Sequence, residues 1–142
     1  MNPKTAELVL ALEYELRKSQ ALISRMADRT DDIAAEESVI IELAAERIME
    51  RIFQATSALP EQIQEKYFGL EPLRFLRGMR NRLAHNYLSV DLRIVEDTIQ
   101  HDLPLVLERM EDDIKKARKF VATAQAEIKD QSTWTHDHLG EI

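Results

Sequence analysis

Cysteine is absent from this chain, and glycine and proline are scarce, with three and four copies among 142 residues. Without cysteine the chain has no disulfide framework, thiolate zinc site, iron–sulfur cluster or cysteine nucleophile. No apolar run is long enough to span a bilayer, and the first residues lack the pattern of a signal peptide. We therefore expect a cytoplasmic protein with no membrane-spanning segment.

Strand patterns are missing as well, because no segment alternates apolar and polar residues clearly. The abundance of Ala, Leu, Glu and Arg favours helices throughout. With 44% apolar residues the chain can form a core, and 142 residues are enough for one domain and too few for two. We predict an all-α fold, an antiparallel bundle of four or five helices over residues 1–130, followed by a C-terminal tail at 131–142.

Apolar residues at three- and four-residue spacings locate the expected helices. These helices cover about 4–26 and 32–56, then 60–69, a stretch that begins near 71, a short stretch at 91–100, and 104–129. Helix 32–56 is apolar around most of its circumference, through Val39, Ile40 and Leu43 among others, so we expect neighbours on two sides. The last helix has the most regular seam, which we expect to be core: Leu103, Leu107, Met110, Ile114, Ala117, Val121, Ala124 and Ile128.

The formal charge of -7 is unevenly distributed along the chain. Between Glu71 and Arg93, five arginines stand against two acidic residues, which makes this segment +3 and the remainder -10. The acidic total argues against a protein that coats nucleic acid through an evenly basic surface. A local basic site remains compatible with this charge.

The helix that begins near residue 71 carries an arginine within its apolar sector. At about 100° per residue, five apolar side chains share this sector: Leu73, Phe75, Leu76, Met79 and Leu83. Arg80 projects inside it, whereas Arg77 and Asn81 fall on the polar side. Burying an unpaired guanidinium is strongly unfavourable. Two interpretations stay open: Arg80 reaches solvent or pairs with a core carboxylate such as Glu42 or Glu46, or it binds an anionic ligand in a partly dry cleft.

His85 follows Arg80 by five residues, which turns it about 140° away on an ideal helix. The two side chains converge if the helix ends near Ala84, or if two copies of the segment meet across a dimer. Histidine transfers protons near neutral pH, and arginine offers paired donors to phosphate oxygens. The grouping therefore suits chemistry on phosphodiesters.

The run Leu76–Tyr87 resembles the R-x4-H-x-Y signature of HEPN domains (higher eukaryotes and prokaryotes nucleotide-binding), and more narrowly their HepT-like branch. The similarity continues through Val90–Val95 and through His101–Pro104, where the branch has an acidic residue, a short helix and a D-L-P turn. The resemblance implies an all-helical homodimer whose motif helices face each other across a cleft.

The resemblance also implies an activity. Members of this branch are toxins of toxin–antitoxin pairs that cleave RNA without a metal or another cofactor, leaving a 2′,3′-cyclic phosphate and a 5′-hydroxyl. Their partner is an MntA-type nucleotidyltransferase, which silences the toxin by attaching AMP to the motif tyrosine. Carried onto this chain, Arg80 and His85 are the catalytic pair, Asn81 and Arg77 position the RNA substrate, and Tyr87 accepts AMP.

Two features depart from the branch. Ile41–Ala44 lacks the glycine of the G-E-A string that many relatives carry, so no role is transferred to Glu42. His136 and His138 have a spacing that permits metal binding, but at a chain end we expect an incidental pair and no metal site. Two alternatives to the toxin stay open: a non-catalytic HEPN dimer that binds a nucleotide or a partner protein, and a purely structural bundle.

Overall fold

The computed structural model describes residues 1–28, 35–85, 88 and 90–139, and within these ranges the chain forms helices and no strand. The prediction of an all-α fold is therefore confirmed. In the same ranges, no helix combines the length and the apolar character that crossing a membrane requires.

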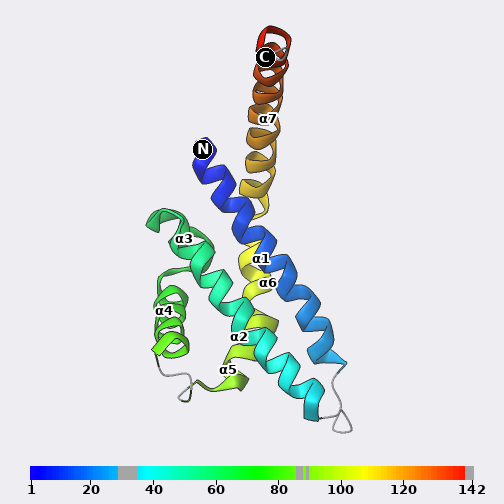
Figure 1. Cartoon of the computed structure of the whole chain (residues 1–142). Helices are drawn as coiled ribbons and strands as arrows, with labels where there is room; N and C mark the ends of the chain where they lie inside the picture. The colour runs from blue at the N-terminus through cyan, green and yellow to red at the C-terminus, as the bar shows by residue number, and fades with distance from the viewer. Residues whose placement is uncertain (29–34, 86–87, 89, 140–142) are drawn as a thin grey trace.

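The helices follow one another with short connections (Figure 1). They are α1 (Pro3–Ala27), α2 (Ala35–Ser57), α3 (Glu61–Phe68), α4 (Leu70–His85), α5 (Leu92–Asp97), the π-helical turn η2 (Thr98–Asp102), α6 (Leu103–Arg109) and α7 (Glu111–Leu139). Local signals set several ends: Asn2 accepts a hydrogen bond from the Thr5 amide at 2.8 Å, and Asp91 caps α5 through the Arg93 amide.

α1 and α2 form the centre of the molecule. α1 packs along both α2 and α7, and α2 lies between α1 and α4 (Figure 1). The core consists of the apolar faces that these helices turn toward one another, including Val9, Leu12, Leu16, Ile41, Met49, Ile52, Leu76, Val95, Met110 and Ile114. This arrangement places the outer surface of α4 on the side of the molecule away from α1.

The predicted last helix, 104–129, begins where expected, but its continuity and its end are wrong. It is divided at Met110, whose amide caps α6 by contacting the carbonyls of Val106 and Leu107, and α7 then continues to Leu139. Its seam is buried only as far as Ala117, and Ile128 is 63% exposed. The reason is that α1 begins at Pro3, and α7 extends past this end, where no helix covers it (Figure 1). The division at residue 130 stays a prediction.

The expectation that α2 has neighbours on two sides is confirmed, because α1 packs along one side of α2 and α4 and α5 pack along another (Figure 1). Part of its apolar surface nevertheless stays exposed. Ile41, Met49 and Ile52 are buried, but Val39, Ile40 and Leu43 are 50 to 60% exposed. Periodicity predicted two apolar faces correctly, but it cannot tell which face the same chain covers. The N-terminal half of α2 therefore presents an uncovered apolar surface.

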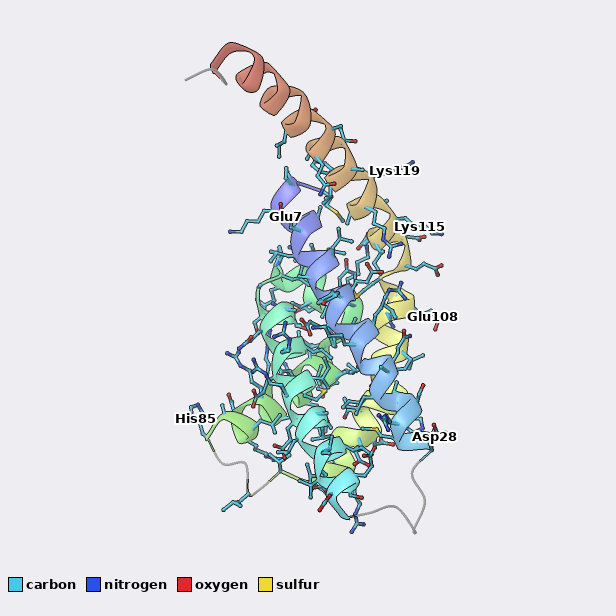
Figure 2. The ribbon with its side chains drawn as sticks, turned by 45° about the vertical axis from the view of Figure 1, so that its right-hand side comes forward. Glu7, Asp28, His85, Glu108, Lys115 and Lys119 are labelled. Atoms are coloured by element: carbon cyan, nitrogen blue, oxygen red, sulfur yellow. The ribbon has the colours of Figure 1, made fainter. Side chains whose placement is uncertain are left out.

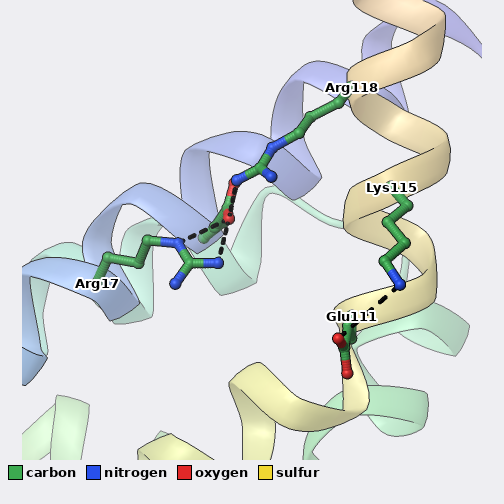
Figure 3. A network of polar contacts seen from close by, with 5 residues as sticks. Arg17, Glu111, Lys115 and Arg118 are labelled. Carbon is green, nitrogen blue, oxygen red and sulfur yellow. Dashed lines mark hydrogen bonds and ion pairs between the residues drawn. The ribbon is translucent and has the colours of Figure 1, made fainter.

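Buried carboxylates join the helices. Glu13 of α1 accepts from Arg17 of the same helix at 2.8 Å and from Arg118 of α7 at 2.6 Å, and Figure 3 shows both guanidinium groups converging on it. Glu15 forms a two-point pair with Arg51 of α2, at 2.9 and 2.7 Å. The hydrogen bonds from Arg51 outweigh the effect of burial and lower the pKa of Glu15.

A third buried carboxylate fastens α3 to α7. Asp113 accepts from the Tyr67 hydroxyl at 2.7 Å and from the Lys66 ammonium at 2.9 Å. Burial alone raises the pKa of Asp113, but these two hydrogen bonds and the nearby lysine charges outweigh it, so the pKa is lowered. Arg109 adds a hydrogen bond to the Tyr67 carbonyl at 3.1 Å. Gly69 then turns the chain into α4 with a φ of 82°, a conformation that favours glycine.

We expect Asp113→Asn to lower the free energy of unfolding at pH 7 by about 1.5 to 3 kcal/mol, because a charged, buried acceptor is removed. A lowered folded-state pKa gives stability that is complete above the ordinary Asp pKa of about 4 and is lost as the pH falls through the folded-state value. The difference from wild type should therefore narrow near pH 3. Urea unfolding at pH 7 and at pH 3 measures this difference in the free energy of unfolding, with exposed Asp112→Asn as the control. An equal difference at both pH values would contradict a lowered pKa of Asp113.

Candidate active site

α4 carries all the described residues of the motif. Its buried face consists of Leu73, Leu76, Met79 and Leu83, on a helix that packs against α2 and α3. Arg82 and His85 lie in its last turn, where cations interact favourably with the helix dipole. Phe75, which the helix pattern placed in the apolar sector, is 48% exposed. The outer face of α4 is therefore basic and polar, with one aromatic side chain at its margin.

Arg80 is exposed, although its position on the helix is the apolar one predicted from the sequence. α2 ends at Ser57, so the long side chain extends past this end, and its Nη1 donates to the Ser57 hydroxyl at 3.4 Å. Of the interpretations left open, the pairing with Glu42 or Glu46 is wrong, because the guanidinium is at the surface beside Ser57. Arg80 is therefore available to a ligand from solvent.

Arg80 and Arg77 share an open hollow of about 350 Å³ on one flank of α4, together with Asn81, Ser57 and Gln64. Gln64 is only 7% exposed, and its Nε2 donates to the Leu59 carbonyl at 2.8 Å. This bond fixes the amide so that its oxygen faces the hollow, where it accepts from Arg77 at 3.3 Å. A buried side chain thus orients one of the two guanidinium groups.

The hollow keeps a net positive charge. Arg80 is oriented by a neutral hydroxyl, and the carboxylate near Arg77 is that of Glu61, which is largely exposed and 3.5 Å away. An exposed ion pair contributes little and is easily exchanged. Two guanidinium groups beside amide and hydroxyl groups are well suited to the oxygens of a phosphate.

Ser57 and Gln64 were not among the sequence predictions. Both precede the motif and lie on other helices, at the end of α2 and within α3. No periodic or motif signal marks them, since a serine near a helix end and a glutamine in a short helix are common. Only the packing of α2 and α3 against α4 brings them to the arginines.

His85 does not line this hollow. α4 remains helical through His85, which rules out convergence with Arg80 by an earlier end of the helix. The side chain is exposed, and Figure 2 shows it at the outer edge of the molecule, where α4 ends. A turn of about 140° therefore separates Arg80 and His85 within one chain. Tyr87, the expected AMP acceptor, lies outside the described residues.

The predicted C-terminal pair has no described side chains, because His136 and His138 lie in the last part of α7. Among the residues whose side chains are described, no three His, Cys, Asp or Glu residues are grouped as a metal ion requires.

Comparison with known proteins identifies the family. The model of the family described as "Ribonuclease HepT-like" matches residues 16–113, a span that contains α2 to α6 and the whole of α4. The chain belongs to the HepT-like ribonuclease family. The resemblance predicted from Leu76–Tyr87 is thereby confirmed.

Three relatives of this HepT-like chain carry RNase in their names. In Methanocaldococcus jannaschii, "Putative RNase MJ0125" is 35% identical over 89 residues, 61% of this chain and 76% of its own length. "Putative RNase MJ1216" of the same organism is 36% identical over 75 residues, which are 53% of this chain and 61% of its own length. "Putative RNase TTE0752" of Caldanaerobacter subterraneus is 28% identical over 107 residues, which are 75% of this chain and 94% of its own length. No solved structure matches the chain.

We expect the two arginines of the hollow to be dispensable for folding. Arg77→Ala and Arg80→Ala should each change the free energy of unfolding by less than about 1 kcal/mol, because their contacts are exposed. Gln64→Leu should cost about 1 to 3 kcal/mol, since the Leu59 carbonyl loses its buried donor. Urea unfolding of the three variants measures this, and a large loss in Arg80→Ala would show that this side chain supports the fold.

Proposed function

We propose that this HepT-like protein is a metal-independent endoribonuclease and the toxin of a toxin–antitoxin pair. The observation that carries the proposal is the hollow on α4, where Arg77 and Arg80 are oriented by Gln64 and Ser57 without a buried counter-charge. Membership of the HepT-like family, and the RNase names of three relatives, make RNA the favoured phosphodiester.

In this proposal the hollow binds the scissile phosphate. Arg80 contacts its oxygens and stabilises the charge that develops on them during transfer. Arg77 and Asn81 line the same hollow and position the RNA strand on either side of that phosphate. Because the hollow is open, the strand enters it without any movement of the helices.

His85 acts as the proton-transfer group, and the proposal requires a homodimer. Within one chain His85 faces about 140° away from Arg80, so a second copy of α4 has to supply the histidine that reaches the phosphate. The uncovered apolar residues Val39, Ile40 and Leu43 of α2 support self-association, because monomeric proteins rarely leave such a surface in water.

The proposed reaction is a transesterification. One copy of His85 takes the proton from the ribose 2′-hydroxyl, and the 2′-oxygen attacks the phosphorus. The bond between phosphorus and the 5′-oxygen breaks, and the now protonated His85 gives its proton to this oxygen. The products are a 2′,3′-cyclic phosphate and a 5′-hydroxyl, and the charge is balanced throughout by Arg80.

Control by the antitoxin belongs to the same proposal. An MntA-type nucleotidyltransferase attaches AMP to Tyr87, two residues after His85 in the sequence. A bulky, anionic nucleotide beside the arginines competes with the phosphate of the substrate for the same donors. Modification therefore silences cleavage without unfolding the helices.

A second candidate function is a non-catalytic HEPN dimer that binds a nucleotide or a partner protein through the same hollow. The observation that favours it is the separation of Arg80 from His85, since a site that only binds phosphate needs no histidine nearby. Cleavage of RNA by the wild-type protein distinguishes the two candidates.

We expect His85→Ala and Arg80→Ala each to reduce RNA cleavage by at least about a hundredfold. His85→Ala removes the proton-transfer group, and Arg80→Ala removes the positive charge that stabilises the phosphate. The helical content and the dimer should be unchanged. Cleavage of a labelled RNA in EDTA, with detection of the cyclic phosphate, measures this. His101→Ala is the matched control, since His101 is also exposed and contacts only Asp97 on its own stretch of chain. Full activity of His85→Ala would overturn the catalytic assignment.

We expect Tyr87→Phe to remain an active ribonuclease and to escape the antitoxin, because the phenol oxygen that accepts AMP is absent. Intact-mass measurement after incubation with ATP and the nucleotidyltransferase should show added AMP on the wild type and none on the variant. Tyr14→Phe, a change at an exposed tyrosine of α1, controls for loss of any phenol. AMP transfer to Tyr87→Phe would place the acceptor elsewhere.

A further inference from the structure

A second hollow, of about 180 Å³, lies on the opposite flank of α4, between this helix and α5. Its lining includes Arg74, Phe75, Gly78, Met79, Arg82 and Val95. Neither the family match nor the residues transferred from the motif account for this hollow. It combines an apolar floor with two arginines, a composition unlike that of the polar Arg80 hollow.

The floor and the arginines have a regular arrangement along α4. Met79 and Val95 are buried beneath the hollow, and Phe75 is about half exposed at its margin. Arg74 and Arg82 stand about one turn before and after Gly78, so a side chain is missing between them. A Cβ placed on Gly78 would find no atom within 4 Å, so the space between the two arginines is open.

Both arginines keep their charge available. Arg74 is 3.3 Å from Glu71, but both side chains are largely exposed, and such a pair exchanges readily with another anion. The carboxylate of Asp91, which also lines the hollow, accepts the backbone amide of Arg93 at 2.9 Å as the cap of α5. The hollow therefore offers two guanidinium groups and a flat, apolar surface between them.

The order of residues around α4 connects the two hollows. At about 100° per residue, Arg80 and Arg77 come first, then Asn81 and His85 on the outermost line of the helix, then Gly78, Arg82 and Phe75. A strand that leaves the first hollow across α4 passes His85 and reaches the second hollow. The direct path across the helix thus has arginines in the hollow at each of its two ends.

We infer that the second hollow binds a nucleotide of the substrate RNA next to the scissile phosphate, its base on Phe75 and the apolar floor and its phosphates on Arg74 and Arg82. This inference rests on the proposed function. An aromatic surface with adjacent arginines is how proteins bind single-stranded RNA without pairing its bases. A free inorganic anion makes no use of the apolar floor, and a purely apolar partner makes no use of the arginines.

The experiment measures binding apart from cleavage. A fluorescent single-stranded 2′-O-methyl RNA, which lacks the attacking hydroxyl, is titrated with the full-length protein at 50 to 200 mM salt. Arg74→Gln combined with Arg82→Gln should reduce the slope of log affinity against log salt by about 0.7 for each phosphate that is no longer neutralised. Arg25→Gln combined with Arg93→Gln removes the same charge from exposed sites outside the hollow and should leave the slope unchanged.

Two further variants separate the base from the phosphates. Phe75→Ala should weaken binding about tenfold at every salt concentration, with an unchanged slope, because the variant cannot stack on the base and still binds the phosphates. Gly78→Leu should fill the space between the arginines and weaken binding, whereas Gly78→Ala should bind normally. Both Gly78 variants add helix propensity in an open position, so loss of folding is not a concern.

The outcomes distinguish this inference from the proposed function. If the wild type cleaves RNA but all the hollow variants bind the 2′-O-methyl strand as tightly and with the same slope, the second hollow is not a nucleotide site, although the proposed function stands. If the wild type cleaves no RNA but these variants show the expected losses, the proposed function fails and the hollow remains an RNA-binding site. A wild type that does not bind the strand overturns the inference.

Discussion

The hydrogen bond from the buried Tyr67 hydroxyl to Asp113 is the contact on which the position of the site depends. It joins α3 to α7, and Lys66 of α3 and Arg109 of α6 reinforce it. α3 leads directly into α4 through Gly69, so the placement of α3 sets the direction in which α4 leaves the turn. Without this anchor, the packing of α4 on α2 would be the main constraint on the motif helix. The anchor is a buried charge, whose contribution depends on its partners remaining in place.

Two groups of arginines have different roles in this acidic protein. Arg51 and Arg118 pair with the buried carboxylates Glu15 and Glu13, and they hold α2 and α7 to α1. The arginines of α4 are instead oriented by neutral groups or by exposed carboxylates, as Arg80 is by Ser57. A net charge of -7 is thus compatible with a phosphate site, because the acidic surface disfavours unspecific contact and leaves one basic helix accessible.

Much of the fold could be predicted from the sequence because it depends on local signals. The apolar spacing of α1, the glycine after α3 and the cap at Asp91 all act within a few residues of where they stand, and the structure has each of them. The break at Met110 was not predicted, since the apolar seam continues through it without a proline or a glycine. The exposure of Ile40 and Leu43 was not predicted either, because a pattern describes a face and not its neighbour.

By itself the sequence determined the helices, the segregation of charge, and the motif from Leu76 to Tyr87 that places the chain in the HepT-like family. Only the tertiary structure decided which groups surround the motif. Ser57 and Gln64 reach Arg80 and Arg77 because α2 and α3 pack beside α4, a contact between residues distant in the chain. Only the structure, too, decided that Arg80 and His85 stay apart within one chain, since α4 keeps its helical turn through His85. The type of each side chain can be read directly from the sequence. Which side chains come together depends on how whole helices pack to remove their apolar faces from water.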